Sequence, residues 1–339
     1  MEKKRIEYLD AIKGFAILLV VMAHTIAWNY SDYNDICVYD PNQPINVKMG
    51  GVIWQLIYSF HMPLFFMVSG FLSYKIYHWK DFFPFLKKKV TRLLIPWIST
   101  FGIIYIVRGS MGYWFLLCLF EISIISFLLI MIMEKVNTRQ NLFFDIVLIC
   151  SAFALLRIFH VQNWELYGIA LGRIYTAFMP FMVGVLLRKY KSLYNLCVCR
   201  SWFYTVTLLL FIVLFVSRYL LNNGIIFLQI YHHSQMVLVL SGSLVVFHAF
   251  AQNLLGRFYV IFSFLGRQTL PIYVLHIMFV LQIPAIGDFI LSQNMVSSLV
   301  LQITCSILIS TIAIALSLLF YKIFIISPLL KWLFFGENK

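Results

Sequence analysis

The chain has 339 residues, 62% of them hydrophobic and only 12% charged, with a mean hydropathy of +0.89. Soluble domains carry roughly 25% charged residues to stay solvated, so this composition excludes an ordinary soluble protein. The net charge of +13 does not indicate nucleic acid as a partner, because no basic stretch is interleaved with aromatic residues in a soluble segment. In a membrane protein, such a charge is typical of Lys and Arg held in cytoplasmic loops.

Long apolar runs recur along the whole sequence and predict about ten membrane spans. A hydrocarbon core of about 30 Å requires roughly 20 apolar residues in a helix. The predicted spans are 6–28, 52–74, 93–108, 112–134, 141–160, 167–187, 202–221, 234–252, 260–283 and 299–325. The expected fold is therefore an all-α integral membrane protein, in which residues 1–339 form a single transmembrane domain with no separate soluble domain.

The distribution of Lys and Arg predicts the orientation in the bilayer. Lys3, Lys4 and Arg5 precede the first span, and a dense group of cations that includes Lys89 and Arg92 lies between the second and third spans. The connections on the opposite side carry few cations and several acidic residues. Because Lys and Arg concentrate in cytoplasmic loops, both termini should be cytoplasmic, and the chain should be a multi-pass protein of the inner, cytoplasmic membrane.

The first helix carries an ionisable face. Lys13 and His24 are eleven residues apart, which returns to nearly the same face about 16 Å along the helix axis. Asp10 lies one turn from Lys13 and could serve only to neutralise it. Gly14 would allow a neighbouring helix to approach closely beside Lys13. Because ionisable side chains are costly in hydrocarbon, this face is a candidate functional site.

Four other helices place ionisable groups at a depth comparable to that of His24. These supporting residues are His61, Glu121, Arg173 and His276. We expect them to face one another, since none can face lipid cheaply. Each His could instead be a hydrogen-bonding contact between helices, and Glu121 could simply pair with Arg173 or a His.

Two further features have simpler readings than a functional site. The run Lys87 to Lys89 is more often an anchor for anionic lipids than a ligand site. The cysteines are scattered, and although Cys197 and Cys199 lie close together, no His or second Cys pair completes a metal site. We expect free thiols and no metal.

These residue types suit acyl transfer. A His can take the proton from a hydroxyl that attacks a thioester, and cations near the cytoplasmic side can bind phosphates. Coenzyme A is a cytoplasmic thioester carrier with several phosphates and a long arm. Its phosphates could rest on the inner cations while its arm reaches towards His24, which could act as a base or as a transient acyl carrier.

Five segments of the sequence follow the motifs of one known family, in the same order. They are R-x-x-x-L-D-x-x-K-G-x-A at 5–16 leading to His24, M-P-L-F-F with S-G-F at 62–71, K-V-T-R-L-L-I-P at 89–96, Y-W-F-L-L at 113–117 and G-R-Q-T-L-P-I-Y-V-L-H at 266–276. Together they resemble membrane-bound acyltransferase family 3, the polysaccharide O-acyltransferase type. Its hallmark is a basic residue, ten other residues and a His in the first helix.

The resemblance implies ten helices and an acyl-CoA donor, most commonly acetyl-CoA. It implies a glycan acceptor, such as a sugar of an envelope polysaccharide, peptidoglycan or another exported glycoside. It also implies that His24 is catalytic and that Lys13, Lys89 and Arg92 bind donor phosphates or gate the site. Glu121 does not match the W-S-L-x-x-E-E pattern of some members and receives no role from it. Some members carry an extracytoplasmic hydrolase-like domain, so a separate extracytoplasmic transferase is a possible partner.

Two other classes of function stay open on the sequence. The first is a transporter of a small molecule or lipid-linked sugar without covalent chemistry, which helices broken at mid-membrane around a sealed polar site would favour. The second is a membrane module of a larger enzyme system with no activity of its own. The favoured hypothesis is an O-acetyltransferase that modifies a polysaccharide of the cell envelope, with the lipid bilayer and the glycan as its partners.

Overall fold

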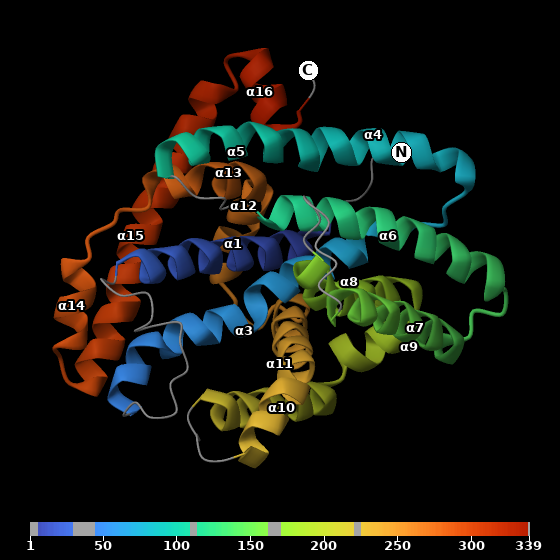
Figure 1. Ribbon diagram of the computed structural model, residues 1–339, viewed down its shortest axis with the longest axis horizontal. Helices are drawn as coiled ribbons and strands as arrows, with labels where there is room; N and C mark the ends of the chain where they lie inside the picture. Colours follow the sequence, from blue (N-terminus) through green and yellow to red (C-terminus); the bar gives the residue numbers. More distant parts are fainter. Residues whose placement is uncertain (1–5, 30–44, 109–113, 162–170, 220–224, 338–339) are drawn as a thin grey trace. The chain divides into compact units, whose positions relative to one another are not determined.

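The computed structural model describes residues 6–29, 45–108, 114–161, 171–219 and 225–337 (Figure 1). Over these ranges the chain forms helices joined by short turns, and no strand occurs in them. The helices belong to two compact units, the first made of residues 1–65 and 196–321 and the second of residues 66–195 and 322–339. Two long helices, α3 (Ile45–Ser73) and α15 (Met295–Phe324), contribute residues to both units.

Among the described residues, five helices are long and apolar enough to cross a membrane: Glu7–Trp28, Val52–Ser73, Trp114–Val136, Ser234–Ala251 and Val296–Phe324. Two bent helix pairs, Lys191–Cys199 with Ser201–Ser217 and Phe258–Arg267 with Thr269–Phe279, raise the number to seven if each pair is one span. The described part of the chain is therefore all-helical and contains several candidate membrane spans, as the composition predicts.

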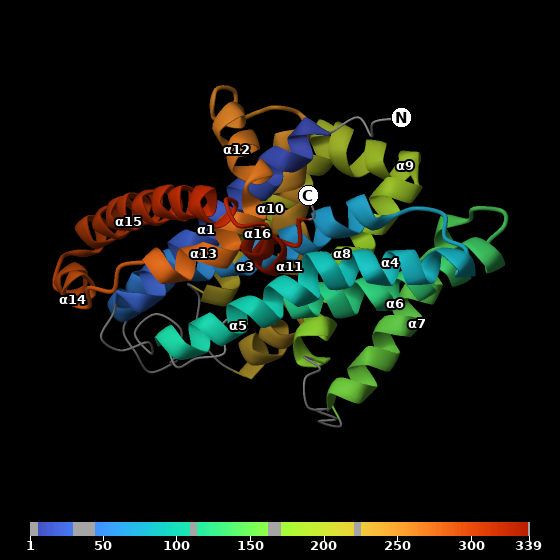
Figure 2. The same ribbon diagram turned by 90° about the horizontal axis from the view of Figure 1, so that it is seen from above.

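Helix α1 (Glu7–Trp28) is the centre of the first unit. It packs against α11 (Ile225–Ala251), α12 (Phe258–Arg267) and α13 (Thr269–Phe279), as both views show (Figures 1 and 2). Most of its side chains are buried, which is the expected position of a helix that is apolar all round.

The backbones of α1 and α12 touch at a reciprocal pair of glycines. A Cβ atom at Gly14 would overlap the carbonyl of Phe262, and a Cβ atom at Gly266 would overlap the carbonyl of Asp10. Small residues permit this approach, which dispersion forces stabilise where no hydrophobic effect acts between helices. The close approach predicted at Gly14 is confirmed.

The chain bends by 85° between α12 and α13, within the span predicted over 260–283. The reason lies at the start of α13. Pro271 has no N–H to donate to the carbonyl of Arg267, and the hydroxyl of Thr269 donates to the carbonyl of Gly266 at 2.8 Å. The backbone at Gln268 is accordingly non-helical.

Polar contacts hold the far end of α13 and the long helix α15 to the end of α1. The side-chain amide of Asn29 donates to the carbonyl of Leu281 at 3.0 Å, and its oxygen accepts from the N–H of Ile283 at 2.6 Å. The hydroxyls of Thr25 and Ser310 are 3.1 Å apart. Three further elements complete the first unit. They are most of η3 (Asn195–Cys199), α10 (Ser201–Tyr219) and α14 (Ala285–Leu291), and α10 packs on α11.

The second unit is built around α6 (Trp114–Val136), α7 (Leu142–Val161) and α8 (Leu171–Lys189), with α9 (Lys191–Tyr194) following α8. Its part of α3 meets α8 at a second reciprocal glycine pair. A Cβ atom at Gly70 would overlap the carbonyl of Phe181, and one at Gly184 would overlap the carbonyl of Met67.

A buried ionic network joins the ends of these helices. The ammonium of Lys189 is 2.7 Å from a carboxylate oxygen of Glu134 and 2.7 Å from one of Asp145, and the Lys189 and Asp145 side chains are 1% and 0% exposed. The hydroxyls of Tyr74 and Tyr190 donate to Glu134 and Asp145 at 3.1 and 2.6 Å. Buried charges persist only with such partners, so we interpret this network as structural.

After η1 (Trp79–Asp81), α4 (Phe82–Lys89) runs through a π-helical turn, η2 (Val90–Leu94), into α5 (Ile95–Arg108). Pro96 has no N–H for the carbonyl of Arg92, and a π turn accommodates such a break. Helix α6 lies alongside α4 and η2, and α16 (Pro328–Phe335) packs on α5 (Figure 2).

Gly14→Ala and Gly266→Ala are each expected to destabilise the protein in detergent by about 1–3 kcal/mol, because the added methyl group forces the α1 and α12 backbones apart. Gly102→Ala is the matched control, since nothing lies within 4 Å of a Cβ atom there and Ala favours the helix. Melting temperatures measured by fluorescence-detected size exclusion separate the two cases. Equal melting temperatures for all three variants would contradict the glycine contact.

Candidate functional site

The His24 imidazole on α1 lies next to that of His276 on α13. The two ring centroids are 5.3 Å apart with an angle of 38° between the ring planes, and the Trp28 ring lies 5.1 Å from His24 on the other side. The His24 side chain is partly exposed, whereas His276 is fully buried at 0%. The structure thus brings together two of the residues that the sequence proposes for one site.

Backbone carbonyls orient the buried imidazoles of the first unit. Nδ1 of His276 is 3.0 Å from the carbonyl oxygen of Ile272 and 2.8 Å from that of Tyr273, and Nδ1 of His61 is 2.7 Å from the carbonyl oxygen of Ile57. A carbonyl oxygen only accepts hydrogen bonds, so Nδ1 carries the proton in each ring. In the neutral ring, Nε2 is then a hydrogen-bond acceptor.

Lys13 and Asp10 form the expected ion pair, with 2.6 Å between the ammonium and a carboxylate oxygen. The Lys13 side chain is 25% exposed and that of Asp10 only 6%. A phosphate that approached Lys13 would have to share the ammonium with this carboxylate. The pair lies directly beside Gly14, at the contact between α1 and α12.

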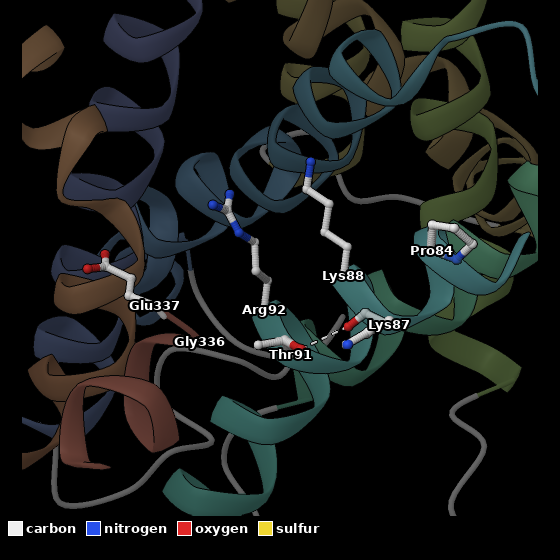
Figure 3. Close-up of a pocket in the computed structure, with 7 residues that line it drawn as sticks. All are labelled: Pro84, Lys87, Lys88, Thr91, Arg92, Gly336 and Glu337. Atoms are coloured by element: carbon white, nitrogen blue, oxygen red, sulfur yellow. Dashed lines mark hydrogen bonds between the residues drawn. The ribbon is translucent and has the colours of Figure 1, made fainter. Parts of the chain in front are cut away.

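A basic hollow of about 520 Å³ lies within the second unit (Figure 3). It is lined by Pro84, Lys87, Lys88, Thr91, Arg92, Gly336 and Glu337. Figure 3 shows the Lys88 and Arg92 side chains extending in a similar direction from the helix, whereas the carboxylate of Glu337, near the end of the chain, points away from them. Three cations and one carboxylate give the hollow a positive surplus, which suits an anion.

The end of α16 closes one side of the basic hollow. Gly336 has a φ of 59°, in the left-handed region that favours glycine after a helix. A Cβ atom there would also overlap the carbonyl of Thr91, so only glycine permits this approach. Lys331 pairs with Glu337 at 3.4 Å across the same helix end.

Lys89 does not line the basic hollow, although Arg92 does. Its ammonium lies 5.3 Å from the centre of the Phe85 ring, a cation–π contact. Burial, with a smaller effect from the neighbouring Lys88, lowers the pKa of Lys89 from its ordinary 10.5 to about 8. The structure therefore separates two cations that the sequence motif groups together.

Glu121 and Arg173 belong to the second unit, like Lys89 and Arg92, whereas His24, His61 and His276 belong to the first. The guanidinium of Arg173 lies 4.8 Å from the centre of the Trp114 ring. Glu121 is half-buried on α6. In the described part of the chain, no group of three or more His, Cys, Asp or Glu side chains could hold a metal ion.

Four residues that line the basic hollow are not predicted as a ligand site by the sequence: Lys87, Lys88, Gly336 and Glu337. The run Lys87 to Lys89 indicates a basic surface, but its simpler interpretation is an anchor for anionic lipids. Gly336 could not be identified as a site residue from the sequence, because no local pattern indicates that α16 packs on α5.

Comparison with known proteins assigns the chain to a protein family. A family model described as an acyltransferase domain matches residues 6–113 and 108–322. The chain belongs to this family, acyltransferase family 3, as its motifs indicate. It is also similar to nodulation protein NolL of Mesorhizobium japonicum (strain LMG 29417 / CECT 9101 / MAFF 303099), with 24% identity over 303 residues that cover 78% of this chain and 74% of NolL. No solved structure matches the chain.

The position of Lys89 predicts its titration. After reductive ¹³C-methylation, the resonance of Lys89, assigned by its loss in Lys89→Arg, is expected to titrate with a midpoint near pH 8. Phe85→Ala should move that midpoint upwards, because water then reaches the ammonium and burial no longer disfavours its charged form. A Lys89 midpoint above pH 10 in the unaltered protein would contradict the buried position.

Proposed function

We propose that the protein transfers an acyl group, most commonly acetyl, from cytoplasmic acyl-CoA to a hydroxyl of an extracytoplasmic or lipid-linked glycan. Membership of acyltransferase family 3 supports the reaction class. The observation that carries the mechanism is the position of His24 on the mostly buried helix α1, with its imidazole 5.3 Å from that of His276. The proposal includes ten spans, cytoplasmic termini and a location in the inner membrane.

In this proposal the basic hollow binds the phosphates of the donor. Arg92, Lys87 and Lys88 provide charged hydrogen-bond donors, and Arg in particular matches the geometry of phosphate oxygens. The cytoplasmic orientation of residues 75–92, proposed from their many cations, places the hollow where coenzyme A is available. Lys13 and Lys89 act as secondary cations, since the first is paired with Asp10 and the second lies over Phe85.

His24 acts as the base in the proposed step. The acceptor hydroxyl attacks the thioester carbonyl while its proton moves to His24, so that a carbon–oxygen bond forms and the carbon–sulfur bond breaks. The proton then passes from His24 to the leaving thiolate, which departs as the free thiol of coenzyme A. The products are an ester and a thiol, and His24 returns to its neutral form. General base catalysis of this kind contributes about 10²- to 10⁴-fold in rate.

An acyl relay through His24 is the alternative within the same reaction class. The imidazole would attack the thioester, release the thiol and form an acyl-imidazole, and the acceptor hydroxyl would then take the acyl group. Rapid quenching of a reaction with radiolabelled acetyl-CoA distinguishes the two, since only the relay leaves label on the protein before acceptor is added.

A transporter is the competing class, and the two bent helix pairs favour it in principle. The breaks follow one another in the sequence, at 191–217 and 258–279, instead of occupying corresponding places in two halves. The family match over most of the chain supports the acyltransferase. A module that needs a separate extracytoplasmic transferase differs from both in requiring that partner for any ester formation.

His24→Ala is expected to lower ester formation by at least about 100-fold, because the base is lost. Arg92→Ala should raise the KM for acetyl-CoA by about tenfold or more, because a charged hydrogen bond to phosphate is removed. The assay measures transfer of radiolabelled acetyl from acetyl-CoA to glycan in inverted membrane vesicles, with protein amounts equalised.

Arg188→Ala is the matched control, since its guanidinium lies over the Phe71 ring at 5.3 Å and does not line the hollow. It should leave the KM unchanged. Full ester formation by His24→Ala would reject the proposed mechanism, and vesicles that move a glycan without forming ester would favour the transporter.

A further inference from the structure

We propose that Trp54 and Tyr58 on α3, the aromatic pair, form a platform that binds a sugar ring of the acceptor glycan. The inference rests on the proposed function, because it requires a glycan as the acceptor. Neither residue lies in the five motif segments at 5–16, 62–71, 89–96, 113–117 and 266–276. The platform therefore adds a binding site for the second substrate.

The rings of the aromatic pair stack on consecutive turns of α3. Their centroids are 4.0 Å apart, with an angle of 28° between the ring planes, a contact that the spacing of four residues in a helix allows. Tyr58 is 39% exposed and Trp54 is half-buried. The pair thus presents aromatic surface that the first unit does not cover.

The aromatic pair leads along one face of α3 to the histidines of the first unit. The Tyr58 ring lies 4.8 Å from the His61 ring, at an angle of 75°, and His61 lies close enough to His24 for the two to interact electrostatically. On this face, the exposed fraction falls from 39% at Tyr58 to 2% at His61 and 5% at Phe65. The open part of the face therefore ends where the imidazoles begin.

A sugar ring matches this surface chemically. One face of a pyranose carries several C–H groups and is apolar, whereas its hydroxyls lie around the edge. The face of a Tyr or Trp ring is electron-rich and attracts such C–H groups, as it attracts the positive edge of another aromatic ring. Stacking on the pair leaves the hydroxyls of the sugar at the rim, from which one can extend towards His61 and His24.

A membrane-interface belt also contains exposed Trp and Tyr residues, but it makes different demands on them. A belt residue faces lipid, and its side chain needs no substrate. A platform residue must be reached by water and by the acceptor. Acceptor affinity and access of water to position 58 therefore separate the two roles.

Acetyl transfer by the purified protein in lipid nanodiscs tests acceptor affinity. The acceptor is envelope polysaccharide from the expressing cells, freed of esters by mild alkali. Tyr58→Ala should raise the KM for this polysaccharide about tenfold, and Trp54→Leu at least about threefold, because a stacking ring is lost. The KM for acetyl-CoA should change less than twofold in both variants.

Two further variants of Tyr58 separate the ring from its apolar bulk. Tyr58→Phe keeps the ring and should keep the KM for the polysaccharide within about twofold. Tyr58→Leu keeps apolar bulk without a ring and should behave like Tyr58→Ala. Trp202→Ala is the matched control, since Trp202 is an aromatic residue of the same unit that is 60% exposed, and both KM values should stay unchanged.

Thiol labelling tests the access of water. Tyr58→Cys is made in a chain whose six native cysteines have been replaced, and a charged methanethiosulfonate is added, which reacts only with thiols that water can reach. We expect labelling, slowed at least about fivefold by the de-esterified polysaccharide. Leu308→Cys is the control for a lipid-facing position, because Leu308 is 59% exposed within the apolar span Val296–Phe324, and it should not be labelled.

Three results would overturn the platform: a KM for the polysaccharide that Tyr58→Ala leaves unchanged, a Leu variant that equals the Phe variant, or a Tyr58→Cys thiol labelled no faster than that of Leu308→Cys. An unaltered protein that transfers no acetyl to the polysaccharide, or a fully active His24→Ala, would instead reject the proposed function. Transfer that requires His24 but not the ring of Tyr58 would reject this inference alone.

Discussion

The contact between the α1 and α12 backbones is the constraint on which the first unit depends. Lipid removes the hydrophobic effect as a force between helices, so close packing of small residues must replace it. Gly14 and Gly266 each lack the Cβ atom that would overlap a backbone carbonyl of the other helix. That contact holds α12 against α1, the bend at Gln268 turns the chain, and α13 then carries the His276 ring to within 5.3 Å of the His24 ring.

The cations of the protein fall into two kinds of environment. Lys13 and Lys189 lie against carboxylates at 2.6 and 2.7 Å, where their charge stabilises the fold and is partly neutralised. The basic hollow gathers three cations around a single carboxylate, and this surplus attracts an anion from solution. The phosphates of the proposed acyl-CoA donor require the second kind of environment, and for this reason we propose the hollow as their site in preference to the Asp10–Lys13 pair.

The lengths of the apolar runs predicted the positions of several long helices correctly but did not predict where helices bend. The spans predicted at 6–28, 112–134 and 299–325 correspond closely to Glu7–Trp28, Trp114–Val136 and Val296–Phe324. The bend at Gln268 was missed because Pro271 stands in the first turn of α13, where proline is tolerated and gives little signal. The cost of burying ionisable groups led to His24 and His276, but the basic hollow needs Gly336 to pack against Thr91, a contact between distant segments that no local pattern reveals.

The most direct test of the account is a cross-link between α1 and α13. Cysteines would replace His24 and His276 in a chain whose six native cysteines have been changed to serine or alanine, and a short bifunctional thiosulfonate would be added to membranes. The account predicts rapid cross-linking, and its loss when Gly266 is changed to Leu, because α12 can then no longer hold α13 in place. A parent that does not cross-link, or a Gly266→Leu variant that cross-links equally fast, would contradict it.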